Sequence, residues 1–288
     1  MHIPPEEWFQ LVNREFRAQN MDVRRRPFLA LDRYCKDFNV RALSFDSAPA
    51  KRIFEWFYAN TKPTAHHIGS MFTGTFFYDF CFWAVDISVG YGQFKLEAPD
   101  CLRSMSASMK EGLMSSPPDA LNYEVLWVDC LDYCYGFDDI QNTFATNSFG
   151  VSLLNNADRE LRTAVAQLLE HHPNSKASMS ARMAVEIYLK AFLALKAGFT
   201  EKQVKALKHR LGDILEKCEE VATGHDILKI ENELTVFPAM DDRYTGEELP
   251  STTLWQAYRI AQYVAASVVR TFTDRDTRAQ LRRPPNVF

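Results

Sequence analysis

The segment Met179–Ala197 constrains the fold of this chain more than any other part of the sequence. Good helix formers dominate it, and its apolar positions wrap nearly all the way round a helix, as expected for a helix buried on most sides. One polar stripe interrupts the apolar surface. Arg182, Glu186 and Lys190 follow each other at intervals of four residues, so they stack as a charge ladder with glutamate ahead of lysine. We therefore expect a helical core built around this segment.

Helix-stop and helix-capping residues after this segment predict a second helix packed along it. Gly198 is a typical C′ residue, where a helix stops. Thr200 and Gln203 have the spacing of a capping box, which begins a new helix. From Val204 to Val221 the apolar positions keep the helical period, and Gly224 ends the pattern. These signals predict one long helix between Thr200 and Gly224.

These residues carry a resemblance to a known family. AVEIYLKAFLAL, a short turn with glycine, KHRLGDIL about twenty residues further on, and a later DRY followed by a helix together resemble the HEPN superfamily. The resemblance covers about residues 155–272. It implies an antiparallel helical bundle, a homodimer formed through that bundle, and a role in phage defence or stress regulation. It gives no counterpart for the N-terminal half.

Composition limits the location and the partners of the protein. Its 288 residues, 47% hydrophobic and 24% charged, suit one large or two ordinary globular domains. A net charge of −4 excludes a surface that is basic all over, so a nucleic acid has to bind a local patch. Six cysteines without framework spacing predict reduced thiols in a cytoplasmic protein. MHIPPEEWF is unlike a signal peptide, and the apolar run Phe76–Val89 is too short to span a bilayer, so we expect no membrane contact.

Three amphipathic helices are predicted in the first sixty residues, over Glu6–Ala18, Phe28–Phe38 and Ala50–Asn60. The residues expected to face inward are Trp8, Leu11, Val12 and Phe16 in the first, and Ile53, Phe54, Phe57 and Tyr58 in the third. Arg24, Arg25 and Arg26 lie between the first two helices. Such a short run suits either a phosphate contact or a solvated surface.

The stretch 65–96 is rich in aromatic residues and is ambiguous between helix and strand. We favour a helix over Thr75–Ile87, followed by an irregular or short β segment through Gly90 and Gly92. A nucleotidyltransferase would carry a Gly-Ser turn and an Asp-x-Asp pair for Mg²⁺. Gly69, Ser70 and Gly74 imitate the turn, but Asp79 and Asp86 do not form the pair. A packed aromatic core is therefore the preferred interpretation.

The predicted fold class is mainly α, an N-terminal helical domain with room for a short β segment followed by a HEPN-like bundle. The expected parts are a domain over 1–136, a connection over 137–154, the bundle over 155–273 and a mobile basic tail over 274–288. Further helices are expected over Tyr123–Tyr135, after the break at Ser115–Asp119, and over Asp158–His171, His225–Leu234 and Ser251–Phe272.

Cysteines and histidines offer a zinc site as an alternative to a plain core. Cys130 and Cys134 share one helical face, and His66, His67, His171 and His172 are the further candidate ligands. Structural zinc usually comes with C-x₂-C knuckles, which this sequence lacks. We therefore interpret both cysteines as small hydrophobic residues, and expect no metal and no cofactor.

Catalytic members of the superfamily use an arginine followed by a histidine four to six residues later, so that histidine takes a proton from the RNA 2′-hydroxyl and arginine stabilises the phosphate. This chain departs from that motif. No arginine stands at that spacing before any histidine, and Lys202 and Lys205 precede His209 instead. Lysine lacks the planar fork of arginine. His209 is the catalytic candidate only if the protein is a divergent ribonuclease.

The polar residues that the resemblance brings together are Glu186, Lys190, His209, Arg210, Arg243 and Tyr244. One interpretation is structural: Glu186 and Lys190 tie the buried helix to its neighbours, His209 is hydrogen-bonded at a helix turn, and Tyr244 anchors its loop. In the other, Lys190, His209, Arg210 and Arg243 line a groove for a nucleotide or RNA phosphate. Three functions follow: a non-catalytic RNA- or nucleotide-binding module, a divergent metal-independent ribonuclease, or a scaffold that docks a protein partner.

Overall fold

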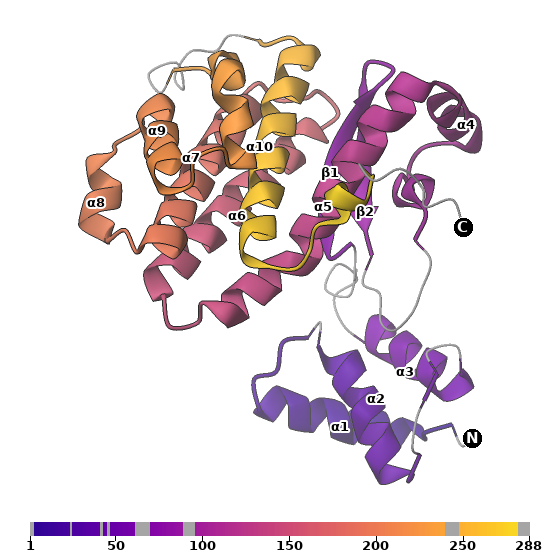
Figure 1. Cartoon of the computed structure of the whole chain (residues 1–288). Helices are drawn as coiled ribbons and strands as arrows, with labels where there is room; N and C mark the ends of the chain where they lie inside the picture. Colours follow the sequence, from indigo (N-terminus) through magenta and orange to yellow (C-terminus); the bar gives the residue numbers. More distant parts are fainter. Residues whose placement is uncertain are drawn as a thin grey trace, which may run out of the picture. The chain divides into compact units, whose positions relative to one another are not determined.

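The computed structural model of the chain describes residues 3–23, 25–40, 43–44, 47–60, 70–88, 96–239 and 248–281. It divides into two compact units, residues 1–69 and residues 70–288. Helices dominate both units, and the second also holds a two-stranded antiparallel sheet (Figure 1). The prediction of a mainly α protein is confirmed at this level.

Three helices make up the first unit, α1 (Glu6–Ala18), α2 (Arg26–Asp37) and α3 (Ala48–Ala59). All three lie where the sequence predicts them, to within two residues at either end. Aromatic rings fill the core between them. Phe9 and Trp56 stack with their ring centroids 5.3 Å apart, and the Trp8 indole donates to Asp37 over 2.9 Å. The unit therefore has its own hydrophobic core.

Two side chains of this unit were expected inside and lie at the surface. Leu11 is 46% exposed and Tyr58 is 39% exposed. The buried arc of α1 is centred between Trp8 and Phe9, and at 100° per residue Leu11 falls outside that arc. Tyr58 falls outside the buried arc of α3 for the same reason, and Phe54 is only half-buried.

The stretch expected to be a helix over Thr75–Ile87 is a β-hairpin, so that prediction was wrong. Strands β1 (Phe72–Tyr78) and β2 (Cys81–Ile87) pair antiparallel, with Phe72 opposite Ile87 and Tyr78 opposite Cys81. Asp79 and Phe80 form the two-residue turn with φ of +51° and +58°, as a type I′ turn requires. Asp-Phe lacks the glycine that usually marks such a turn, which is why the sequence did not reveal it.

The hairpin also removes the nucleotidyltransferase interpretation. Asp86 accepts a hydrogen bond from Thr73 over 3.0 Å near one end of the hairpin, and Asp79 lies in the turn at the other end. The two carboxylates therefore do not converge on one cation. Gly69, like Gly90 and Gly92, lies outside the described residues.

The second unit starts at the hairpin, so the expected boundary near residue 136 was wrong. Two short helices, η2 (Ala98–Cys101) and α4 (Ala107–Ser115), lead to α5, a single helix over Pro117–Thr143 that runs through the predicted boundary. Most of the expected connection 137–154 belongs to α5 and to the first turns of α6 (Ser148–Leu168). Gly136 lies inside α5, at a position where α10 approaches so closely that a side chain would not fit. A Cβ there would be 2.3 Å from Val269 Cγ1.

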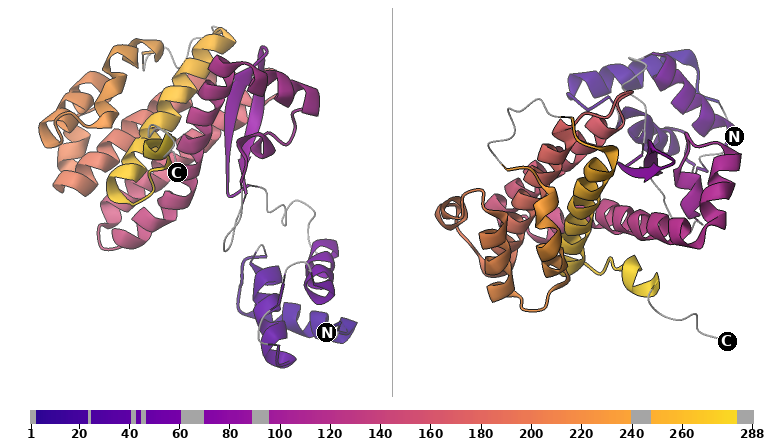
Figure 2. Two further views of the ribbon diagram at one scale, coloured as in Figure 1. Left: turned by 45° about the vertical axis from the view of Figure 1, so that its right-hand side comes forward. Right: turned by 90° about the horizontal axis from the view of Figure 1, so that it is seen from above.

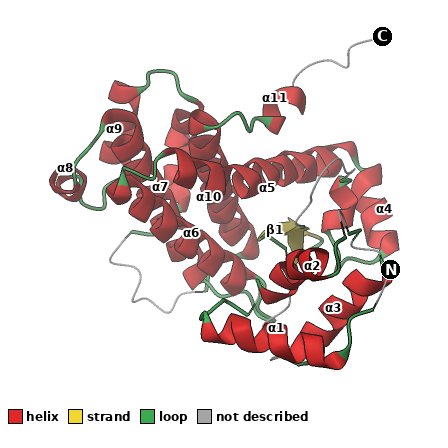
Figure 3. Cartoon of the chain, turned by 90° about the horizontal axis from the view of Figure 1, so that it is seen from below, coloured by secondary structure: helices red, strands yellow, loops and turns green. Residues whose placement is uncertain are grey.

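The long helices of this unit pack around α7 (Lys176–Ala197), which is buried on nearly every side as predicted. Helix α6 packs along it on one side, and α9 (Leu211–Val221) and α10 (Ser251–Phe272) cover the others. The hairpin packs against α5, α6 and α10, at the side of this unit opposite α8 (Glu201–Ala206) and α9 (Figure 2). Seen from below, it is the strand part of an otherwise helical arrangement (Figure 3).

Two expectations for this half need correction. The single helix expected between Thr200 and Gly224 is broken into α8 (Glu201–Ala206) and α9, because Lys208 adopts a left-handed conformation with φ of +51°. The segment expected to be a mobile tail contains α11 (Thr277–Leu281), which packs on α5. The 3₁₀ helix η3 (Asp226–Val236) and helix α10 lie where helices were expected.

Candidate functional site

Glu186 is the centre of the predicted polar set. Its side chain is 2% exposed. Lys190 Nζ lies 2.7 Å from its Oε1, Arg182 Nη1 lies 3.4 Å from its Oε2, and His209 Nδ1 lies 2.9 Å from Oε1. The charge ladder predicted on α7 is therefore present, with His209 added from the loop before α9. We call Arg182, Glu186, Lys190 and His209 the Glu186 cluster.

The two cations of the ladder also hold the backbone of that loop. Arg182 Nη2 donates to the carbonyl oxygen of His209 over 2.7 Å, and Lys190 Nζ donates to the carbonyl oxygen of Lys208 over 2.6 Å. Helix ends leave such carbonyl groups without partners inside the helix. Buried charged donors satisfy them here, so the turn between α8 and α9 is tied to the most buried helix of the bundle.

Side chains of the same segment point outward and are mostly basic. The exposed residues of this kind are Lys202, Lys205, Lys208, His209 and Arg210, which we call the basic surface. Lys205 pairs with Glu201 over 2.6 Å and Arg210 pairs with Asp213 over 2.6 Å, and all four side chains of these pairs are at least 43% exposed. Such exposed pairs contribute little, about 0–1 kcal/mol.

Only part of the predicted phosphate groove comes together. His209 is 58% exposed and Arg210 is 70% exposed on the basic surface, but Lys190 points inward to Glu186 and is only 10% exposed. Arg243 and Tyr244 lie outside the described residues. Glu186 and Lys190 have the contacts of the structural interpretation. Lys208 was not among the candidate residues, because nothing in the sequence revealed its left-handed turn.

A second buried cluster was not predicted at all. Asp129 and Asp132 of α5 are 3% and 2% exposed. Arg270 of α10 bridges them, with Nη2 2.6 Å from Asp129 Oδ1 and Nε 2.7 Å from Asp132 Oδ2. Arg278 of α11 lies 3.2 Å from Asp129. We call these four residues the Asp129 cluster.

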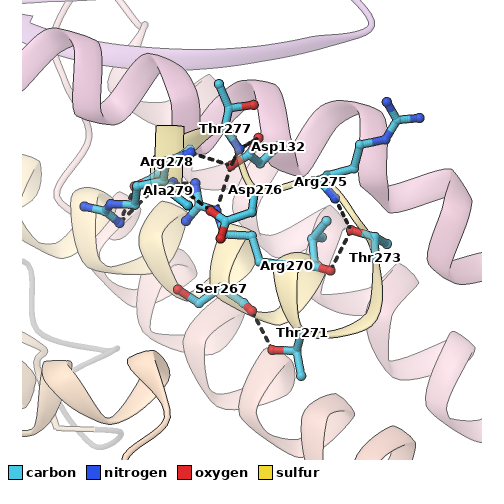
Figure 4. A network of polar contacts seen from close by, with 12 residues as sticks. Asp132, Ser267, Arg270, Thr271, Thr273, Arg275, Asp276, Thr277, Arg278 and Ala279 are labelled. Carbon is cyan, nitrogen blue, oxygen red and sulfur yellow. Dashed lines mark hydrogen bonds and ion pairs between the residues drawn. The ribbon is translucent and has the colours of Figure 1, made fainter. Parts of the chain in front are cut away.

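This cluster fastens the C-terminal segment to α5. The backbone N–H of Thr277 donates to Asp132 over 2.9 Å, and Figure 4 shows the Asp132 carboxylate between that group and Arg270. Arg275 pairs with Asp139 over 2.9 Å at the edge. The sequence indicates this cluster only through two aspartates three residues apart on an apolar helix face. That spacing does not show which arginines pair with them.

Burial changes the proton affinity of this cluster. Removal from water raises the pKa of Asp129 from 3.8 to about 6, although Arg270 and Arg278 act in the opposite direction. Desolvation outweighs the attraction of both arginines. The carboxylate therefore gains a proton at a pH where an exposed aspartate stays ionised.

The cysteines expected to behave as hydrophobic residues are deeply buried. Cys130 is 0% and Cys134 is 5% exposed, and burial raises the pKa of the Cys134 thiol to about 12. A thiol with a raised pKa is a poor source of the thiolate that zinc binds. Across the described part of the chain, no three side chains of the metal-binding kinds come together. His66 and His67 lie outside that part.

Similarity to known proteins assigns no function to this chain. None of the helices in the described ranges combines the length and the apolar character needed to cross a bilayer. Comparisons of the chain with protein-family models, with curated proteins and with solved structures each give no match.

Proposed function

We propose that the second unit is a HEPN-like, non-catalytic RNA-binding module that contacts the phosphate backbone through the basic surface. One observation carries the proposal: the Glu186 cluster fixes the backbone of the turn between α8 and α9, while the side chains of that turn remain in solvent. A preorganised loop of cations binds phosphate without losing the entropy of ordering a mobile loop.

Charge supports the same conclusion. Four cationic side chains lie within ten residues of one another, those of Lys202, Lys205, Lys208 and Arg210. The acidic residues over 201–213 are Glu201 and Asp213, so positive charge is in excess there. The exposed pairs of Glu201 and Asp213 are weak enough for phosphate to replace them. This local excess is the kind of patch that a chain with a net charge of −4 needs for nucleic-acid binding.

RNA suits the basic surface better than a single nucleotide does. The four cations are spread over a short helix and the turn after it, so they match several phosphates in a row rather than one phosphate group. A contact of this type is electrostatic, sequence-tolerant and weakened by salt. The homodimer that the resemblance implies stays a prediction, which sedimentation velocity tests.

Fluorescence anisotropy with a labelled single-stranded RNA of about 20 nucleotides, between about 50 and 200 mM KCl, tests the proposal. In the triple variant Lys202→Gln, Lys205→Gln and Lys208→Gln, we expect affinity at the lowest salt to fall about tenfold or more. The slope of log K against log salt should fall by about 2, since each single-strand phosphate contact contributes about 0.7.

A matched control removes the same charge elsewhere. Lys36, Lys51 and Lys176 are exposed and lie away from this turn in the sequence, and their triple Gln variant should bind RNA like the wild type. A titration that stays flat at low salt, or two triple variants that bind equally, would contradict the proposal. A flat titration would leave the scaffold with a protein partner as the surviving alternative.

The geometry of His209 favours a divergent ribonuclease as the second candidate. Glu186 contacts Nδ1 and so orients the imidazole, whose side chain is 58% exposed, and Nε2 is then the atom that would take a proton from a 2′-hydroxyl. The predicted result is RNA cleavage that persists in EDTA and disappears in His209→Ala. Intact RNA after long incubation with the wild type excludes this candidate.

A further inference from the structure

A cavity of about 250 Å³ lies within the second unit beside the Asp129 cluster, and none of its lining residues belongs to the basic surface. Residues of four elements line this half-open cavity: α5, η3, α10 and α11. The lining residues include Val125 and Leu126 of α5, Ile230 of η3, Ile260 and Tyr263 of α10, and Arg278 of α11. Neither the fold nor the proposed RNA contact uses this space.

One wall of the cavity is apolar and another carries a cation on an aromatic ring. Val125, Leu126, Ile230 and Ile260 supply the aliphatic surface. The Arg278 guanidinium lies 4.7 Å from the centroid of the Tyr263 ring, which it covers as a cation–π pair. The cavity thus combines an apolar body with a fixed positive charge, the two features that a small amphipathic anion needs.

In the Asp129 cluster, the ion pair between Arg278 and Asp129 is the one that a bound anion can most easily replace. Its Nη1 is 3.2 and 3.3 Å from the two oxygens of Asp129, whereas Arg270 Nη2 approaches the same carboxylate to 2.6 Å. Charge-assisted bonds are usually about 2.7–2.9 Å long. Among the described residues the Arg278 side chain makes no other hydrogen bond, so most of its donors are available.

We propose that this cavity binds a small organic monoanion with an apolar body, which lies against Val125, Ile230 and Ile260 and takes Arg278 from Asp129. Arg270 stays with Asp129 and Asp132, so the bundle keeps its central bridge. Helix α11 stays fastened through Asp132, whose carboxylate accepts from the backbone of Thr277. The site binds by exchanging one ion pair rather than by opening the fold.

Competition between ligand and Asp129 gives the site a dependence on pH. A protonated Asp129 no longer competes for Arg278, so the anion binds more tightly as the pH falls through about 6. The charged and titratable groups that face Asp129 or share the cavity are Arg270, Arg259 and Tyr263 of α10, Arg278 of α11, Asp132 of α5, and Lys229 and Glu233 of η3.

The probe for this site is 8-anilinonaphthalene-1-sulfonate, whose sulfonate stays ionised over the whole range and whose fluorescence rises in an apolar site. We expect one molecule to bind the folded full-length protein, about tenfold more tightly at pH 5.5 than at pH 7.5, because the protonated fraction of Asp129 changes by at least that factor. Near-UV circular dichroism at both pH values checks that the protein stays folded.

Variants separate the site from non-specific adsorption. Arg278→Leu removes the cation and Val125→Trp fills the half-buried wall, and each should lower affinity at least about tenfold. Arg275→Gln, on the same segment but paired with Asp139 outside the cavity, should bind as the wild type does. Asp129→Asn should bind equally well at both pH values. Equal binding in the wild type, Arg278→Leu and Val125→Trp, or no binding at either pH, would overturn the proposal.

Discussion

The two buried charge clusters of the second unit are built from similar groups and differ in how the sequence assembles them. In the Glu186 cluster one carboxylate faces three basic side chains, two of them a single helical turn away on α7. In the Asp129 cluster two carboxylates of α5 meet arginines that lie 138 to 149 residues further along the chain. The first therefore holds a local turn in place, and the second fastens distant helices together.

The clusters also differ in what happens when one partner is lost. An arginine left in the Glu186 cluster cannot give up its charge, because a guanidinium group is not deprotonated in proteins. An aspartate left in the Asp129 cluster can take a proton, and burial already raises the pKa of Asp129 to about 6. Damage to the first should therefore be more severe, and damage to the second should depend on pH.

Glu186→Gln is expected to have the largest effect. It leaves Arg182 and Lys190 buried without a counter-charge, which costs about 3–5 kcal/mol of unfolding free energy. Urea denaturation followed by circular dichroism measures the loss. Glu201→Gln, which breaks only the exposed pair with Lys205, is the control and should change stability by less than about 1 kcal/mol. Similar losses in both variants would show that the buried carboxylate does not hold the turn.

Arg270→Met should cost about 3 kcal/mol at pH 7, because it leaves Asp129 and Asp132 buried without their shared partner. Without Arg270 the pKa of Asp129 rises further, so at pH 5 this carboxyl is neutral and the loss should be smaller. Urea denaturation at the two pH values measures the difference. Arg275→Gln, which removes the half-exposed pair with Asp139, is the control. An equal loss of unfolding free energy at pH 5 and pH 7 would contradict the conclusion that Asp129 becomes protonated between these pH values.

Asp129 should also give the wild type a pH dependence of its own. Its pKa is raised in the folded state, so between about pH 4 and 6 the folded protein binds more protons than the unfolded chain. The cost of ionising the buried group is therefore present at pH 7 and is relieved as the pH falls through 6 towards 4. Relative to Asp129→Asn, the unfolding free energy of the wild type should rise by about 2–3 kcal/mol as the pH falls from about 7 to 4. Parallel stability curves of the two proteins would refute this.

Lys208→Gly should have the smallest effect on stability and act in the opposite direction. Glycine adopts the φ of +51° found at this position without the penalty that a side chain meets there, so the unfolding free energy should rise by up to about 1 kcal/mol. The carbonyl that Lys190 binds is retained. RNA affinity should fall modestly in the same variant, since one cation of the basic surface is gone. Thermal unfolding and anisotropy together separate the two effects.

The difference between the clusters also marks how far sequence reasoning reaches. Arg182, Glu186 and Lys190 are a helical turn apart, so their spacing alone predicts their contact. The Thr200 capping box and the left-handed Gly198 are equally local, and both are present. The partners of Asp129 could not be found this way, because helix periodicity shows that α5 and α10 are helices but not that Asp129 meets Arg270.

Local conflict explains the other errors. The hairpin Phe72–Ile87 contains aromatic residues that suit strands and helices alike, and its Asp-Phe turn carries no glycine. Gly136 looks like the start of a loop, but close packing with Val269 requires it inside α5. Lys208 breaks the expected helix because Arg182 and Lys190 bind carbonyl groups of the resulting turn. In each case tertiary packing decides between local alternatives.

Hydrogen–deuterium exchange with and without saturating RNA tests most directly whether the basic surface, held by the Glu186 cluster, is the binding site. The amides of residues 201–210 should gain protection when RNA binds at low salt. Residues 251–281, which carry the arginines of the Asp129 cluster, should exchange as before. Protection confined to residues 251–281, or none at saturating RNA, would contradict the account.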